Sequence, residues 1–385
     1  MIETAVNIKS KLPHFNNSIF ATMTQLADKH NAINLSQGFP DFNCSAELAK
    51  LVNKYINNGD NQYAPMKGVE SLRNILSKKY QHLHKADYHP EDEITITAGA
   101  TQAIFSAITA FVHEDDEVII IEPSFDTYAP SIMYNGGVIK YSVTYPPDFT
   151  INWEQTRRLI SSRTKMIILN FPNNPTGKNI REYDLQQLSN LVANTDIIIM
   201  SDEVYEHILF DNQQHLSLSS DKELAKRSLI ISSFGKTYSI TGWKLGYCLA
   251  PEKLTHEFRK AHQNIVFAAN HPMQKALTEY IKNNGYGDSY NKFYQQKRDY
   301  FLSLMSSSRF RMIPSEGTFY QLADFGKISE QTDLDFAKTL TTKHKVAAIP
   351  LSAFYHNNIN HQIVRFCFAK SDDTLKKATD ILCKI

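Results

Sequence analysis

Residues 233–237 read Ser-Phe-Gly-Lys-Thr and directly follow the apolar run Leu-Ile-Ile at 229–231. Two earlier apolar runs, at 166–169 and 197–200, also end in polar clusters. Short apolar runs of this kind are typical of strands buried in a sheet. Because ligands bind at the carboxyl ends of parallel strands, the polar side chains after the three runs should meet in one crevice. These side chains are Asn174, Asp202, Tyr205 and Lys236.

Each cluster also has an ordinary structural interpretation when it is taken alone. Gly235-Lys236-Thr237 resembles the end of a phosphate-binding P-loop, but Ile230 stands where that motif needs a glycine. A lone loop lysine is usually a solvated charge, and Asp202 alone could cap a helix. Asn-Pro-Thr-Gly at 174–177 alone is most often a turn. The order and spacing of all three clusters favour the functional interpretation.

The composition is that of an ordinary globular protein without a strongly charged surface. The chain has 385 residues, 42% of them hydrophobic and 21% charged, with a formal net charge of +1. These values give no electrostatic reason to expect nucleic acid or an anionic membrane as a partner. The four cysteines are scattered and form no C-x-x-C pair, which fits neither a zinc site nor a disulfide framework. We therefore expect a cytoplasmic protein.

Apolar strand patterns alternate with helical patterns through most of the chain, which predicts an α/β fold. Helical spacing occurs at 19–27, 46–58, 68–84, 101–112, 153–161 and 182–193, and over two long stretches at 252–283 and 288–306. Strands are expected at 94–97, 117–121, 138–143, 166–169, 197–200, 228–232 and 245–250. Strands buried on both faces and separated by helices indicate a mostly parallel central sheet covered by helices. A C-terminal unit should add strands near 319–322 and 363–366 and helices at 333–344 and 372–384.

Over nearly its whole length the chain resembles the class I and II pyridoxal-phosphate aminotransferases of fold type I. The resemblance is strongest to their methionine and kynurenine–glutamine branch. Besides the three clusters, it rests on the stretches at 34–42, 61–65, 97–103, 241–247 and 365–369. It implies an N-terminal arm at 1–45 that joins a small domain, a large cofactor-binding domain at 46–285, and the rest of the small domain at 286–385.

The resemblance assigns Lys236 as the Schiff-base lysine of pyridoxal 5'-phosphate and as the proton carrier of the reaction. Asp202 would keep the ring nitrogen protonated, while Tyr205 and Asn174 would reach the phenolic oxygen of the ring. Phe125 would stack on the ring, although a buried aromatic residue is the ordinary interpretation. The phosphate would be held by Gly99, Ala100, Thr101, Ser233 and Lys244. Many relatives have arginine at the last of these positions.

Substrate recognition is carried over from the family in the same way. Arg365 sits in an apolar strand, where it must either pair with a buried acid or bind a substrate carboxylate. The family assigns it to the α-carboxylate, with Asn174 and the backbone of Gly38 at the same group. Ile19 and Phe20 would line the side-chain pocket. Tyr63 would reach the phosphate of a neighbouring subunit, which implies a homodimer with shared active sites.

We expect an aminotransferase that moves the amino group of methionine, an aromatic or a similar neutral amino acid to a 2-oxo acid. A carbon–sulfur β-lyase would use the same residues and stays open as an alternative. A regulator of transcription is disfavoured, since no basic DNA-binding pattern precedes residue 34. No G-x-G-x-x-G follows the early strands, so a dinucleotide-binding enzyme is disfavoured as well. We expect no metal, because the histidines form no H-E-x-x-H.

Overall fold

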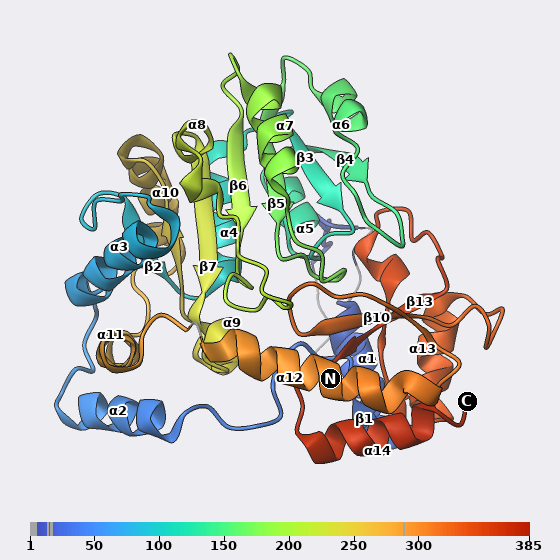
Figure 1. Cartoon of the computed structure of the whole chain (residues 1–385). Helices are drawn as coiled ribbons and strands as arrows, with labels where there is room; N and C mark the ends of the chain where they lie inside the picture. The colour runs from blue at the N-terminus through green and yellow to red at the C-terminus, as the bar shows by residue number, and fades with distance from the viewer. Residues whose placement is uncertain (1–5, 14, 16–17, 288) are drawn as a thin grey trace.

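A seven-stranded sheet forms the centre of the protein (Figure 1). In this computed structural model, which describes residues 6–13, 15, 18–287 and 289–385, the strand order is β2-β8-β7-β6-β5-β3-β4. Neighbours from β7 to β4 are parallel, and β8 is antiparallel to both strands beside it. The predicted mostly parallel α/β fold is confirmed. The bounds are β2 Ile94–Thr97, β3 Glu117–Glu122, β4 Val138–Val143, β5 Thr164–Asn170, β6 Ile198–Asp202, β7 Ser228–Ser233 and β8 Gly246–Leu249.

The reversed direction of β8 has a local cause. Between β7 and β8 the chain forms only the four-residue helix α9 (Phe234–Thr237) and the 3-10 turn η2 (Thr241–Trp243). A parallel connection would need a crossover, usually a helix that runs along the sheet face. The segment that carries Lys236 is therefore a short link that stays at the carboxyl end of β7.

Helices cover both faces of this sheet, because successive side chains of a strand point to opposite sides. On β3, Val118 and Ile120 belong to a core shared with α4, α5 and α10. Ile119 and Ile121 belong to the opposite core, shared with α2, α3, α7 and α11. Burial on both faces explains the continuous apolar runs in the sequence. The bounds are α2 Ala46–Asn57, α3 Glu70–His84, α4 Ala100–Phe111, α5 Tyr128–Tyr134, α6 Trp153–Leu159, α7 Glu182–Val192, α10 Glu252–Ile265 and α11 His271–Asn284.

A second group of elements joins the two ends of the chain beside the carboxyl edge of the large sheet (Figure 1). β1 pairs in parallel with β11, and α1 packs against α13. An antiparallel sheet of order β12-β13-β10-β9 lies next to them, and α12 packs along α14. The predicted domain boundaries at 45 and 285 stay a prediction, and residues 1–5, 14 and 16–17 of the predicted arm lie outside the described residues. The bounds are α1 Ile19–His30, β1 Ile33–Asn34, α12 Ser289–Leu304, β9 Arg311–Ile313, β10 Tyr320–Asp324, α13 Asp333–Thr342, β11 Val346–Ala347, β12 Ile349–Pro350, β13 Ile363–Cys367 and α14 Asp372–Leu382.

The prediction of one long helix over 252–283 is wrong, since α10 and α11 are separate helices. Phe267 between them has a φ of +64°, which ends the first helix. The Asn270 side chain then accepts the N–H of Met273 and caps the second helix, with Pro272 in its first turn. Proline suits a first turn because it has no N–H to donate. Among the described residues no helix is long and apolar enough to cross a lipid bilayer.

Candidate active site

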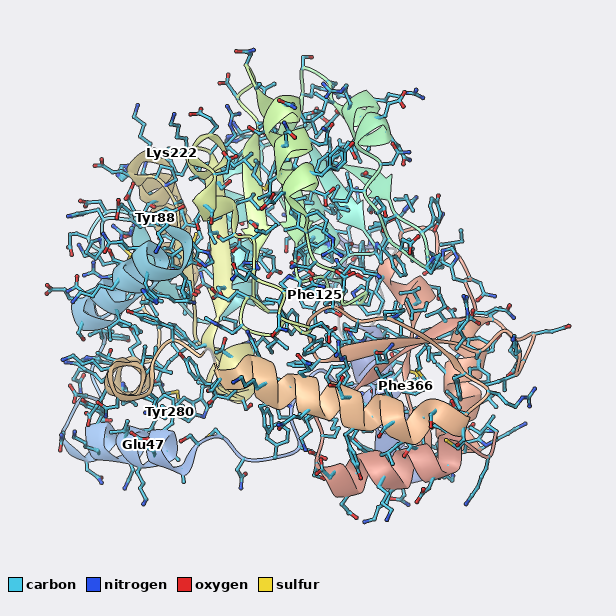
Figure 2. All side chains as sticks on the ribbon, viewed as in Figure 1. Glu47, Tyr88, Phe125, Lys222, Tyr280 and Phe366 are labelled. Atoms are coloured by element: carbon cyan, nitrogen blue, oxygen red, sulfur yellow. The ribbon has the colours of Figure 1, made fainter. Side chains whose placement is uncertain are left out.

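A cavity of about 290 Å³ lies where β5, β6 and β7 end. It brings together most of the residues that the sequence singles out, including the four that follow the apolar runs. Figure 2 shows Phe125 near the middle of the molecule, between the large sheet and the C-terminal elements. The predicted residues that line the cavity are Phe20, Gly38, Gly99, Ala100, Thr101, Phe125, Asn174, Asp202, Tyr205, Ser233, Lys236 and Lys244.

Lys236 extends into the cavity from α9, the helical turn after β7. The Ser233 hydroxyl accepts the N–H of Gly235 over 3.1 Å and so fixes the start of this turn. The Lys236 amine donates to the carbonyl oxygen of Gly38 over 3.3 Å. Its side chain is half-buried because it faces the cavity, yet loss of water around the amine lowers the pKa of Lys236 to about 8. A larger share of the amine is therefore neutral and nucleophilic near neutral pH.

Asp202 is the last residue of β6 and is buried at the wall of the cavity. Its Oδ2 accepts a hydrogen bond of 2.5 Å from the Tyr128 hydroxyl, and its Oδ1 accepts the N–H of Val204 over 3.3 Å. Burial raises the pKa of Asp202 to about 6, although these two hydrogen bonds and the Lys236 charge oppose the shift. A cationic N–H in the cavity would stabilise the charged form of this carboxylate.

Asn174 and Tyr205 reach the cavity from the loops that follow β5 and β6. The backbone N–H of Asn174 donates to the side-chain oxygen of Asn170 over 2.9 Å, and the Asn170 amide donates to the carbonyl of Asp202 over 2.9 Å. The Tyr205 hydroxyl donates to the hydroxyl of Tyr320 over 3.1 Å. Both residues are buried. The Asn170 bonds tie the ends of β5 and β6 together, and the Tyr205 hydroxyl connects this edge to β10.

Arg365 on β13 is completely buried behind the cavity. Its Nη1 donates to the Asn174 side-chain oxygen over 2.5 Å, and its Nη2 donates to the carbonyl of Ser36 over 2.9 Å. Its Nε has no hydrogen-bond partner in the described part of the chain. Among the described residues no carboxylate forms an ion pair with Arg365, so the alternative of a buried acidic partner is not what the structure has. The guanidinium carbon lies 3.8 Å from the ring centre of Tyr320 and 5.2 Å from those of Phe20 and Phe354.

The first turn of α4 forms an anion-binding end of the cavity. Gly99 precedes the helix with a φ of +81°, a conformation that glycine adopts without strain. The helix then begins at Ala100 and Thr101, where N–H groups lack intrahelical partners and the helix dipole is positive. Lys244 approaches from the turn before β8, and a Cβ atom at Gly99 would lie 3.6 Å from its amine. Together with the Ser233 hydroxyl, these groups could bind a phosphate.

Besides Arg365, which lies behind the cavity, two predicted residues do not line it. Tyr63 is 84% exposed, and its ring packs edge-on against the exposed ring of Phe267 at 5.6 Å. Ile19 packs against the core of the C-terminal elements, whereas its neighbour Phe20 faces the cavity. The assignment of Ile19 to the pocket wall is therefore wrong in this structure. Position in α1 decides the difference, since adjacent helical residues point about 100° apart.

The sequence interpretation missed three aromatic residues of the site. Tyr128 donates to Asp202, Tyr320 contacts both Tyr205 and Arg365, and Phe354 lies beside Arg365. Tyr128 stands three residues after Phe125, within the first turn of α5, and this spacing is the only local signal for it. Tyr320 and Phe354 come from the C-terminal elements, and no local pattern connects them to the strand ends.

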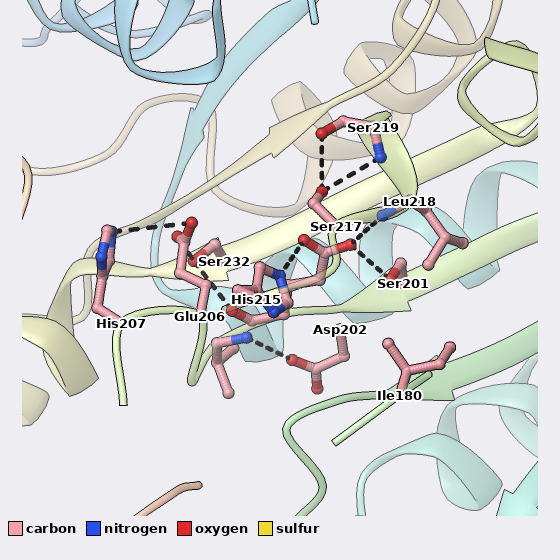
Figure 3. Close-up of polar contacts among 12 residues, drawn as sticks. Ile180, Ser201, Asp202, Glu206, His207, His215, Ser217, Leu218, Ser219 and Ser232 are labelled. Atoms are coloured by element: carbon pink, nitrogen blue, oxygen red, sulfur yellow. Dashed lines mark hydrogen bonds and ion pairs between the residues drawn. The ribbon is translucent and has the colours of Figure 1, made fainter. Parts of the chain in front are cut away.

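A separate buried polar cluster lies beside Asp202, on the other side of β6 and β7 (Figure 3). We call it the Glu206 cluster; it comprises Glu206, Lys79, Tyr247, Ser232 and His207. One Glu206 oxygen, Oε1, lies 2.8 Å from the Lys79 amine and accepts bonds of 2.5 Å from both Tyr247 and Ser232. Burial alone would raise the pKa of Glu206, but the Lys79 charge holds that pKa well below its usual range.

The fold and the site together place this protein among the fold-type I enzymes that use pyridoxal phosphate. The family model for aminotransferase class I and II matches residues 30–382. The chain is 42% identical to the methionine aminotransferase of Escherichia coli over 97% of both sequences. It is 33% identical to the kynurenine–oxoglutarate transaminase of Dictyostelium discoideum, over 96% of this chain and 94% of that protein. The solved structure of E. coli YbdL, described with a methionine aminotransferase function, has a TM-score of 0.96 and covers 99% of this chain and 100% of its own.

The chain therefore belongs to the class I and II aminotransferases and is a pyridoxal-phosphate-dependent enzyme. The site fits this cofactor. Among the described residues, no carboxylate pairs with the Lys236 amine and no cation directly contacts the buried Asp202 carboxylate, while the far end of the cavity can bind an anion. These three features match an aldehyde, a ring nitrogen and a phosphate.

Proposed function

We propose that this enzyme transfers the amino group of methionine, an aromatic or another fairly large neutral L-amino acid to a 2-oxo acid. One observation carries the proposal: Arg365 is buried and surrounded by aromatic rings, and no carboxylate in the described part of the chain forms an ion pair with it. A substrate α-carboxylate would neutralise this arginine, and an apolar side chain would contact Phe20. The names of the E. coli and D. discoideum relatives support the same substrate class.

Pyridoxal phosphate, when bound, supplies an aldehyde that captures amines and a ring that stabilises negative charge on the substrate α-carbon. Lys236 would hold the aldehyde covalently, and Asp202 would keep the ring nitrogen protonated. Tyr205 and Asn174 would bind the phenolic oxygen, and Phe125 would cover one face of the ring. The phosphate would be held by Gly99, Ala100, Thr101, Ser233 and Lys244.

Lys236 also moves the proton of the reaction. Its free Nζ would take the proton from the substrate α-carbon as a general base and would deliver that proton, as a general acid, to the carbon of the bound aldehyde. The pKa of about 8 suits both directions, because neither the neutral nor the charged amine is rare near pH 8. Arg365, Asn174 and the backbone of Gly38 hold the α-carboxylate, so the α-hydrogen stays within reach of that amine.

The cations of the site favour a neutral substrate side chain. Among the described residues that line the cavity, only Lys236 and Lys244 are cationic, and both already have proposed roles. An aspartate donor would bring a second carboxylate that no further cation of this chain meets there. A neutral side chain leaves no such charge unpaired.

A homodimer would complete the site. Tyr63 and Phe267 form an aromatic pair that is exposed in the isolated chain, at 84% and 47%. Contact with a second copy would bury this pair and bring the Tyr63 hydroxyl to the partner's phosphate site. We place the enzyme in the cytoplasm, since its four cysteines are unpaired thiols of the kind that a reducing compartment preserves.

The test is a substrate screen on the purified enzyme with pyridoxal phosphate. Methionine, phenylalanine, kynurenine, glutamine and aspartate are each paired with several 2-oxo acids, and the new oxo acids are identified by mass spectrometry. We expect the highest kcat/KM for methionine or an aromatic donor. A clear preference for aspartate would contradict the proposal. Release of pyruvate and ammonia from a cysteine conjugate, without transfer from any donor, would identify the β-lyase instead.

A further inference from the structure

Tyr320 contacts three residues of the proposed site, although none of the family motifs in this sequence includes it. It lies on β10, is buried, and lines the cavity. Its hydroxyl is hydrogen-bonded to that of Tyr205 at 3.1 Å, and its ring lies 3.8 Å from the guanidinium carbon of Arg365. The backbone of Gly38 packs on the same side chain so closely that a Cβ atom there would meet the Tyr320 oxygen at 1.8 Å.

We propose that Tyr320 is a positioning residue that fixes two groups at once, the hydroxyl of Tyr205 and the guanidinium plane of Arg365. The inference rests on the proposed function, in which Tyr205 serves the cofactor and Arg365 serves the substrate. One side chain of the small C-terminal sheet thereby keeps the two binding subsites in a fixed relation to each other.

The Tyr320 hydroxyl can either donate a hydrogen bond to Tyr205 or accept one from it. A tyrosine hydroxyl has one proton to donate and can also accept, and rotation about its C–O bond exchanges these roles. Tyr205 donates to Tyr320 in the structure. When an oxygen acceptor lies in the cavity next to Tyr205, Tyr205 turns its proton to that acceptor and Tyr320 donates to Tyr205 in return. Tyr205 then stays fully bonded in both states of the site.

The stacking contact fixes Arg365 without neutralising it. A carboxylate partner would also hold the guanidinium in place, but it would neutralise the positive charge that binds the substrate carboxylate. The face of an aromatic ring attracts a cation while leaving its N–H groups and net charge available. Asn174 and Ser36 occupy Nη1 and Nη2 with neutral acceptors, and no described residue is hydrogen-bonded to Nε. The direct contacts of Arg365 are thus with neutral groups, and Asp126 interacts with it electrostatically without forming an ion pair, so the guanidinium stays available to an incoming carboxylate.

Two variants separate the two contacts. Tyr320→Phe removes the hydroxyl and keeps the ring, so the cofactor-free enzyme should bind pyridoxal phosphate about 3- to 10-fold more weakly. The visible absorbance of the bound cofactor should also change its pH dependence, while KM for methionine should rise only slightly, since the hydroxyl also interacts with Arg365. Tyr320→Leu removes the ring as well, so KM should rise by a further factor of about 5 to 30. If the Tyr320→Leu variant does not fold, Tyr320→Met serves the same purpose.

Tyr355→Phe is the matched control, because the buried Tyr355 hydroxyl donates to the carbonyl of Thr144 over 2.9 Å and does not line the cavity. It should lower thermal stability but leave cofactor affinity, absorbance and KM unchanged. A double-mutant cycle completes the test: in a Tyr205→Phe background, Tyr320→Phe should weaken cofactor binding no further.

The outcomes distinguish this inference from the proposed function. A wild-type enzyme that forms no covalent link between pyridoxal phosphate and Lys236 would overturn the proposed function itself. A wild-type enzyme that forms this link, together with a Tyr320→Phe variant of normal affinity and absorbance, would overturn the hydrogen-bond role alone. Equal KM values for the phenylalanine and leucine variants would overturn the stacking role.

Discussion

Two buried groups of charged residues, the Glu206 cluster and the cavity, lie on opposite sides of β6 and β7 and differ in how their charges are paired. In the Glu206 cluster, one carboxylate oxygen contacts an ammonium group and two hydroxyls within 2.8 Å. At the cavity, the Lys236 amine donates to one carbonyl oxygen at 3.3 Å, and Arg365 behind it is hydrogen-bonded to neutral groups alone among the described residues. Asp202 and Glu206 are four residues apart, so the contrast arises from tertiary contacts and not from the local chain.

The difference separates a structural role from a binding role. When two opposite charges are buried together, their attraction offsets much of the free-energy cost of removing them from water. Removing one of the two charges is therefore destabilising. A buried charge that faces a cavity without such a partner keeps an unfavourable contribution to folding that a ligand can relieve. Mutations in the two regions should therefore change stability in opposite directions.

The largest effect is expected at the cavity. Lys236→Ala should abolish transamination, because the same amine binds the aldehyde and moves the proton; loss of general acid–base catalysis alone costs about 10²- to 10⁴-fold. The cofactor-free variant should nevertheless be more stable than the cofactor-free wild type. Lowering the Lys236 pKa from 10.5 to about 8 costs folding roughly 3 kcal/mol, which the substitution removes, less the loss of side-chain packing. Turnover assays and urea unfolding of the cofactor-free proteins measure both effects.

Near-normal turnover in Lys236→Ala would refute the assignment of this residue. Borohydride reduction followed by peptide mapping gives an independent check, since the cofactor should be attached to the peptide that contains residue 236. A label on another peptide would have the same meaning.

The second-largest effect is expected from a substitution that removes the negative charge of the Glu206 cluster. Glu206→Gln leaves the Lys79 ammonium buried beside a neutral amide and should lower the free energy of unfolding by about 3–5 kcal/mol. Activity per folded molecule should change little, because Glu206 does not line the cavity. The double variant Lys79→Met with Glu206→Gln should recover part of the lost stability, as measured by urea unfolding. Additive losses in the double variant would show that the pair is not the source of the stability.

Much of this contrast could be predicted from the sequence, but not its details. The apolar runs placed Asn174, Asp202, Tyr205 and Lys236 at one sheet edge, because the ends of parallel strands necessarily meet there. Tyr320 could not be found in this way. It reaches the site from β10, and its distance to Tyr205 depends on how two separate sheets pack.

The remaining errors have similar causes. The break between α10 and α11 had a signal in Asn270-His271-Pro272, which outweighs an uninterrupted pattern of apolar spacing. The Glu206 cluster had no signal, since a buried carboxylate four residues after Asp202 looks the same in sequence as an exposed one. Tyr63 stays a prediction, because its proposed partner belongs to a second copy of the chain.

A third prediction uses pH to measure how much the buried Asp202 carboxylate lowers the free energy of unfolding. In the cofactor-free enzyme Asp202 titrates near pH 6, whereas an ordinary aspartate titrates near 3.8. The folded chain therefore holds more protons than the unfolded chain between about pH 4 and 6, and stability falls as pH rises through this window. In wild type the free energy of unfolding should fall by roughly 3 kcal/mol across this window because of Asp202, and Asp202→Asn should remove this fall. Urea unfolding between pH 4 and 7 measures the difference between the two proteins.

An Asp→Asn substitution at the exposed Asp148 is the control for this series. Subtracting each variant from wild type cancels the other titrating groups, so the Asp202 contribution stands alone. A difference curve for Asp202→Asn that stays flat from pH 4 to 7 would show that burial does not perturb this carboxylate.

The smallest effect concerns the anion-binding end of the cavity. Lys244 offers one ammonium group to the proposed phosphate, whereas arginine could form two parallel hydrogen bonds to it. Lys244→Ala should weaken binding of pyridoxal phosphate by about 3- to 10-fold, and Lys244→Arg should preserve or slightly improve it. Equilibrium binding to the cofactor-free enzyme is the measurement. Lys222→Ala is the control, because Lys222 is exposed at the start of α8 (Lys222–Ala225), does not line the cavity, and lies well away from the cavity residue Phe125 in Figure 2. Equal losses from Lys244→Ala and Lys222→Ala would mean that general positive charge, and not this particular contact, attracts the phosphate.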